Sequence, residues 1–202
     1  MPLSPSAESA VAHTRAWVET AVIGLNLCPF AKGVQAKGQV RYVVTDAADA
    51  QALLAVLTSE LQTLAAADAQ RVDTTLLIHP FALVDFTDYN QFLDVADAAL
   101  VALRLNGMLQ IASFHPDYQF AGTEAGDVTN ATNRAPYPTL QLLREESITR
   151  AVAAFPAADA IFEANIRTVE ALGADGWATL QARCRSDAAA AVRASTETLP
   201  RP

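Results

Sequence analysis

Cysteine and glycine are scarce in this chain of 202 residues, which contains 2 cysteines and 8 glycines. Cys28 and Cys184 could form at most one disulfide, and we expect both to be free thiols in a reducing compartment. The sequence has no glycine-rich dinucleotide turn, no phosphate loop, no Gly-x-Ser-x-Gly, no His-Glu-x-x-His and no Cys-x-x-Cys. These absences remove most support for the common nucleotide-binding, serine-hydrolase, zinc-protease and redox classes.

A basic surplus and long apolar runs are also missing. With 14 basic and 22 acidic residues the formal net charge is −8, which argues against nucleic acid or an anionic membrane as the main partner. The N-terminus lacks the basic region and apolar stretch of a signal peptide, and no apolar segment approaches the length of a membrane span. We therefore expect a cytoplasmic protein whose partner is a small molecule or another protein.

The hydrophobic periodicity predicts an α/β fold. It indicates a small, mainly parallel sheet of at least three strands flanked by helices, with extra C-terminal helices, because strands and helices alternate along the chain. We expect a single domain over residues 1–202, ordered over about 6–194, with short frayed termini. The predicted strands are 40–45, 74–78 and 109–114, and the predicted helices are 6–29, 47–64, 88–105, about 138–155, and two more separated at Gly173.

Two histidines, each followed by proline, mark the ends of two predicted strands. His79 follows strand 74–78 and His115 follows strand 109–114. The proline prevents further ladder pairing, and the carboxyl ends of parallel strands share the edge where α/β sheets bind ligands. We expect both imidazoles to face one cavity as catalytic acid, base or metal ligand, with hydrogen-bonded structural histidines as the alternative.

The segment 116–136 lacks periodicity but is too aromatic for a disordered linker, so we interpret it as a functional loop. Its candidate ligand-binding residues are Tyr118, Asp127, Asn130, Asn133 and Arg134. The guanidinium of Arg134 suits a carboxylate or phosphate, whereas a loop braced by its own asparagines is the alternative.

Arg144 and Cys28 complete the candidates. Arg144 falls on the inward stripe of the helix predicted after Pro138, where its charge needs either an anionic ligand or a salt bridge to Asp117, Asp127 or Glu145. Cys28 is a candidate nucleophile, although a buried small hydrophobic residue is the alternative because the end of a helix disfavours a thiolate.

Several stretches resemble an uncharacterised family of bacterial and plant proteins, domain of unknown function family 1415. The resemblance covers nearly the whole chain except the termini. It rests on NLCPFA (26–31), HP (79–80), FHPDYQF (114–120), NRAPYPTLQLLREESI (133–148) and ANIRTVEALG (164–173). It implies that 114–148 is the family's signature, and it brings no established activity.

Two functions remain open from the sequence. The first is an enzyme acting on a small anionic metabolite at a His/Arg/Asn pocket at the strand C-termini, by acid–base or metal-assisted chemistry. A divalent metal would use His79, His115 and either Asp117 or Asp127, although no spacing matches a strong metal motif. The second is a non-catalytic binding or adaptor protein whose 114–148 segment forms a partner interface. The sequence does not decide between them, and it leaves the cofactor and the oligomeric state open.

Overall fold

The computed structural model describes residues 5–154 and 160–197, and its strands form one mixed sheet between two groups of helices. The strands are β1 (Val40–Val44), β2 (Thr74–Ile78), β3 (Leu109–Phe114) and β4 (Thr139–Arg144). The helices are α1 (Ala7–Trp17), α2 (Ala31–Ala36), α3 (Ala50–Ala66), α4 (Phe86–Ala102), α5 (Glu145–Ala154) and α6 (Ile161–Glu197). A π-helix, η1 (Val18–Ile23), continues α1, and a 3-10 helix, η2 (Val128–Asn133), precedes β4.

The sheet has the order β1-β2-β4-β3. β1 and β2 are parallel, whereas β4 is antiparallel to both of its neighbours, β2 and β3. The prediction of a mainly parallel sheet is therefore wrong. The three strands found in the sequence do run in the same direction, so their C-terminal ends share one edge as expected, although β4 separates β3 from β2.

The error lies in residues 139–144, which were predicted to begin a helix. Leucines three residues apart suggested helical spacing, but Leu140 and Leu142 also alternate with Gln141 and Leu143, which is the period of a strand. Leu140 and Leu142 are fully buried on one face of the sheet. The helix begins only at Glu145, so Arg144 is the last residue of β4.

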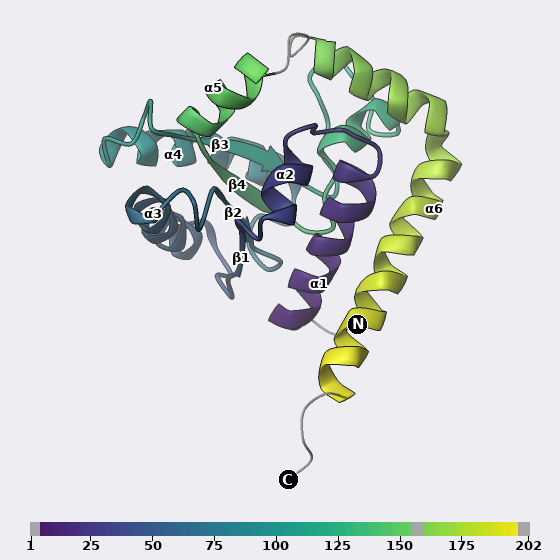
Figure 1. Ribbon diagram of the computed structural model, residues 1–202, viewed down its shortest axis with the longest axis horizontal. Helices are drawn as coiled ribbons and strands as arrows, with labels where there is room; N and C mark the ends of the chain where they lie inside the picture. The colour runs from purple at the N-terminus through teal and green to yellow at the C-terminus, as the bar shows by residue number, and fades with distance from the viewer. Residues whose placement is uncertain (1–4, 155–159, 198–202) are drawn as a thin grey trace.

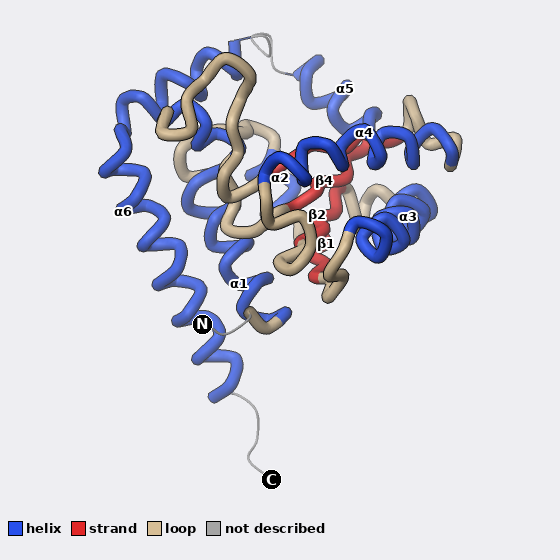
Figure 2. Tube along the Cα trace, turned by 180° about the vertical axis from the view of Figure 1, so that it is seen from behind, coloured by secondary structure: helices blue, strands red, loops and turns tan. Residues whose placement is uncertain are grey.

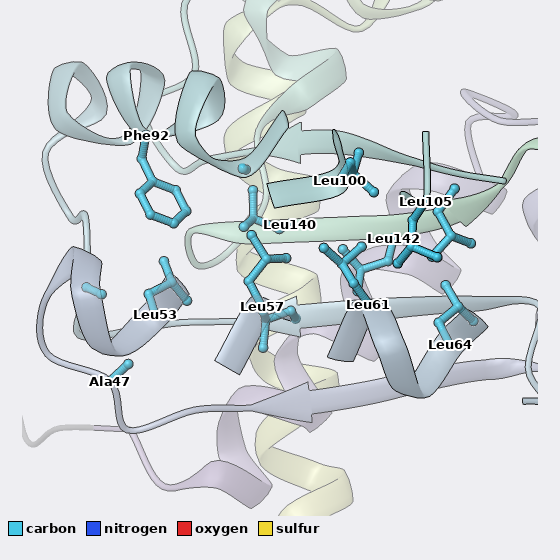
Figure 3. Packing of buried hydrophobic residues seen from close by; sticks show 14 of the residues in the cluster. Ala47, Leu53, Leu57, Leu61, Leu64, Phe92, Leu100, Leu105, Leu140 and Leu142 are labelled. Atoms are coloured by element: carbon cyan, nitrogen blue, oxygen red, sulfur yellow. The ribbon is translucent and has the colours of Figure 1, made fainter. Parts of the chain in front are cut away.

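The first core lies between the sheet and the helices α3 and α4 (Figure 3). The side chains of Leu53, Leu57, Leu61 and Leu64 form the inner stripe of α3, and all four are fully buried. Such leucines typically contribute about 2–5 kcal/mol each, judged by truncation to alanine. The side chains of Asp49 and Asp85 cap the N-termini of α3 and α4 by accepting backbone N–H groups.

The second core lies on the opposite face, where α1 and α6 pack beside one another (Figures 1 and 2). The two helices are antiparallel, because Ser195 near the end of α6 bonds Glu8 at the start of α1, and Cys184 bonds the carbonyl of Ala16. Gly173 interrupts α6 with a φ of 71°, a conformation that favours glycine, and the predicted break there is confirmed. No helix within the described ranges is both long enough and apolar enough to cross a bilayer.

Candidate functional site

The two histidines lie close together, as the shared strand edge predicts. His79 and His115 are 0% and 1% exposed, and both rings contact the ring of Tyr89 on α4. The centroid distances to Tyr89 are 5.8 Å for His79 and 5.0 Å for His115. The hydroxyl of Tyr89 donates to the carbonyl of Thr139 and accepts the N–H of Phe114, which ties α4 to the edge pair β3 and β4.

Backbone groups fix the tautomer of each ring. The Nδ1 of His79 lies 2.9 Å from the carbonyl of Ala82 and must donate to it, which leaves Nε2 unprotonated in the neutral ring. In His115 the Nδ1 accepts the N–H of Asp117, so Nε2 carries the proton that is donated to the carbonyl of Leu83. Burial lowers the pKa of His79 to about 4 and also lowers the pKa of His115. Both imidazoles are therefore held neutral, and they anchor the loop between β2 and α4.

The predicted metal ligands do not assemble. Across residues 5–154 and 160–197 no group of three or more His, Cys, Asp or Glu side chains could hold a metal ion. Asp117 lies two residues after His115, and its hydrogen bond to that ring comes from its backbone N–H.

The predicted loop residues bond mainly to the loop itself. Arg134 donates to the carbonyls of Tyr118 and Ala125. Asn130 is fully buried and accepts the N–H of Phe120 through its amide oxygen. Asp127 caps η2, and the N–H and hydroxyl of Thr129 lower its pKa. This arrangement matches the self-braced loop that the sequence left open as an alternative.

Arg144 donates to main-chain carbonyls at the C-terminal end of α3. Its guanidinium bonds the oxygens of Leu64, Ala67 and Val72 at 2.7–3.2 Å. The positive charge thus faces the negative end of the α3 dipole, where the carbonyl of Leu64 also accepts the N–H of Ala67. Among the described residues no carboxylate pairs with Arg144, and its Nη1 has no hydrogen-bond acceptor, so the predicted salt bridge is not formed.

A cleft of about 890 Å³ opens on the face of the sheet opposite α3 and α4. We call it the sheet-face cleft. Neither histidine is among its lining residues, but Cys28, Asn133 and Arg144 are. Its further polar and charged lining includes Lys37, Gln39, Asp73, Thr74, Gln110, Gln141, Ser147, Arg150 and Asn165, and its apolar lining includes Trp17, Val18, Val22, Leu27, Phe30 and Phe114.

Strand alternation places polar side chains on the floor of this cleft. Leu140 and Leu142 face the leucine core, so Gln141 between them faces the cleft and donates to the hydroxyl of Thr74 on β2. Gln110 on β3 and Thr74 both pair with Leu143, so they flank the same residue of β4. The floor therefore presents amide and hydroxyl groups where a sheet face is usually covered by apolar packing.

The wall that carries Cys28 depends on an unusual turn. After the π-helix η1, the N–H groups of Gly24 and Leu27 bond the carbonyls of Glu19 and Val22, five residues earlier. A Cβ at Gly24 would lie 2.2 Å from the carbonyl oxygen of Thr20, so only glycine fits. The turn replaces the helix that was predicted to reach Pro29, and it brings Cys28, half-buried, to the cleft.

Asparagines from two distant segments support the same wall. Asn165 of α6 donates to the carbonyl of Leu27, and Asn133 donates to the carbonyl of Ser113 at the end of β3. Asn165 was not among the predicted site residues, although it lies in 164–173, one of the stretches that resemble the family. Gln110 and Gln141 were also missed. Each is a polar residue between apolar ones in a strand. This pattern normally indicates a solvent-facing position, so it did not point to a site.

Comparison with known proteins identifies the chain by family alone. The model of a family described as protein of unknown function (DUF1415) matches residues 9–179. No curated protein and no solved structure gives a match.

Proposed function

The chain belongs to the DUF1415 family of unknown function, which assigns no activity, and we propose from the geometry that it binds a small organic anion in the sheet-face cleft. The observation that carries the proposal is electrostatic. Among the described residues, four charged ones line the cleft: Lys37, Arg144 and Arg150 are basic, and Asp73 is acidic. In a chain of formal net charge −8 this is a local reversal of sign.

The shape supports a small ligand rather than a protein partner. A volume of about 890 Å³ falls in the range of small-molecule sites, which are concave and combine apolar walls with a few polar groups. The polar side chains of the 114–148 segment, by contrast, bond mostly to their own loop or to neighbouring backbone, as Arg134 and Asn130 do. A flat interface built from this segment would have fewer free groups with which to recognise a partner.

The histidines are assigned a structural role in this proposal. Their ring hydrogen bonds go to the backbone, and neither lines the cleft. If the cleft also supports chemistry, the half-buried thiol of Cys28 is the group to test as a nucleophile.

Cys28 also provides a direct assay of occupancy. Cys184 is 2% exposed, so alkylation of the native protein by iodoacetamide should occur at Cys28. A ligand in the cleft should slow this alkylation and stabilise the fold by about 2.7 kcal/mol at a hundredfold excess over its Kd. A panel of carboxylates and phosphates at constant ionic strength separates specific binding from screening.

Charge variants make the assay specific. Lys37→Gln and Arg150→Gln should weaken binding of an active anion. Two control variants should leave binding unchanged, because neither residue lines the cleft. They are Lys32→Gln on α2, the helix that ends just before Lys37, and Arg167→Gln, which like Arg150 is paired with a glutamate four residues away. If no anion in the panel protects Cys28 or raises the Tm, or if the control variants lose as much as the cleft variants, the proposal is wrong.

A further inference from the structure

We propose that the anion bound in the sheet-face cleft is amphipathic, a carboxylate whose apolar tail extends toward Trp17 and Phe114. This inference rests on the proposed function and adds the class and the orientation of the ligand. It follows from the separation of charged and apolar groups along the cleft.

The charged residues gather at one edge of the sheet. Arg144 ends β4, and α5, which carries Arg150, begins at the next residue. Asp73 immediately precedes β2, and Lys37 lies between α2 and the start of β1. All four therefore lie where β1 and β2 begin and β4 ends.

Asp73 is the one carboxylate among the described residues that line the cleft, and it is already engaged. The hydroxyl of Ser147 donates to Asp73 and accepts a hydrogen bond from Arg150. Lys37 is exposed, and the Nη1 of Arg144 has no acceptor among the described residues. Arg150 also pairs with Glu146 at the start of α5, whereas Lys37 and the Nη1 of Arg144 remain as cationic donors for a carboxylate head group.

The opposite end of the cleft is apolar. The rings of Trp17 and Phe114 meet with centroids 5.4 Å apart, and Val22 and Leu27 belong to the same cluster. The amide nitrogen of Asn165 is already used, since it donates to the carbonyl of Leu27. An apolar tail removes this wall from water without leaving a polar group of the ligand unpaired.

The register of the sheet gives the distance between the two ends. Phe114 pairs with Thr139 at the start of β4, and Arg144 is five residues further along the same strand. At about 3.4 Å per residue the ends are roughly 17 Å apart, so a compact anion cannot contact both. A medium-chain carboxylate, extended along the floor of Thr74, Gln141 and Gln110, can.

A homologous series of carboxylates tests the class of ligand. With the full chain, protection of Cys28 and the Kd from calorimetry are measured for acetate, butanoate, hexanoate, octanoate and decanoate. Each buried methylene should tighten binding about fourfold until the tail fills the apolar end. Decanol and decylamine test the head group, and both should bind at least tenfold more weakly than decanoate. Affinity that does not depend on chain length, or decylamine binding as tightly as decanoate, overturns the inference.

Quenching of tryptophan fluorescence tests the orientation. In a Trp177→Phe background Trp17 is the remaining tryptophan. A decanoate brominated at its terminal carbon should quench it strongly, whereas one brominated beside the carboxylate should quench it weakly. The reverse order overturns the proposed polarity. If Trp177→Phe does not fold, protection of Cys28 in the unmodified chain still decides the chain-length dependence.

The two proposals fail in different ways. If compact anions protect Cys28 as well as decanoate does, the cleft binds anions but the amphipathic class is wrong. If no carboxylate or phosphate of any length binds, both proposals are wrong.

Discussion

The buried imidazole of His79 should make the free energy of unfolding depend on pH. The folded chain holds this ring neutral with a pKa of about 4, while the unfolded chain titrates it near the ordinary histidine pKa of 6.5. Between these two values the unfolded state binds a proton that the folded state does not, so stability falls as the pH is lowered through this window. Above about pH 6.5 the ring is neutral in both states and contributes no pH dependence.

The magnitude follows from the two pKa values. Lowering the pKa of His79 from 6.5 to about 4 corresponds to a loss of about 3 kcal/mol in the free energy of unfolding once the pH has fallen below both values. Near pH 4.5 the loss should already be about 2–3 kcal/mol relative to neutral pH. This is a large part of the about 5–15 kcal/mol that stabilises a typical domain.

The test compares the native chain with His79→Asn by urea unfolding at a series of pH values. The asparagine amide nitrogen can still donate to the carbonyl of Ala82, but it does not titrate. The variant is expected to be less stable at neutral pH because it loses the ring stacked on Tyr89. The comparison therefore uses the change in the free energy of unfolding with pH rather than its absolute value. The variant should lack the loss of about 2–3 kcal/mol near pH 4.5, because the other titrating side chains are present in both proteins.

A control and a refuting result complete the design. His13→Asn removes a half-buried histidine whose pKa is also lowered by burial, and it should change the pH dependence less than His79→Asn. If the curves of the native chain and His79→Asn stay parallel from neutral pH down to about 4.5, the imidazole is not held neutral by the fold and the reasoning is wrong.

Three substitutions test other contacts by chemical denaturation. Arg144→Met should cost about 3–5 kcal/mol, because it removes the charged donor that bonds the carbonyls of Leu64, Ala67 and Val72. A loss below about 1 kcal/mol would contradict this role. Tyr89→Phe should cost about 2–3 kcal/mol by leaving a buried carbonyl and an N–H unpaired, and a neutral effect would show that water replaces the hydroxyl. Gly24→Ala should lower the free energy of unfolding by more than about 1 kcal/mol, because the added Cβ meets the carbonyl of Thr20. It should also change the rate at which Cys28 is alkylated, since the turn positions Cys28. Unchanged stability and an unchanged alkylation rate would show that the turn can relax.

The sequence predicted the elements whose signals were local. Strands 74–78 and 109–114 and the helices packed against them were found because the apolar period and the proline stops agreed. Residues 139–144 failed because their leucines satisfy both a helical and a strand spacing, and only the long-range pairing with β2 and β3 selects the strand. That one error also placed Arg144 on a helix.

The candidate site was predicted in part for a similar reason. The proximity of His79 and His115 follows from strand direction, which local patterns reveal. The cleft is instead built from Cys28, Asn133, Arg144 and Asn165, which lie in four separate stretches joined by tertiary packing. Whether an arginine finds a carboxylate, a ligand or the free carbonyls of a helix end depends on which element packs beside it, and a single sequence does not encode that as a local pattern.

The position of β4 has a consequence for how the chain acquires its fold. During synthesis β1, β2 and β3 emerge with α3 and α4, but the place between β2 and β3 stays empty until residues 139–144 follow. Until then β2 and β3 each expose an unpaired edge to the ribosome's surroundings, which favours pairing with other chains. Folding of the sheet is therefore expected to wait for a strand inserted late and at its centre, a non-local step of the kind that slows folding and makes protection of the nascent chain valuable.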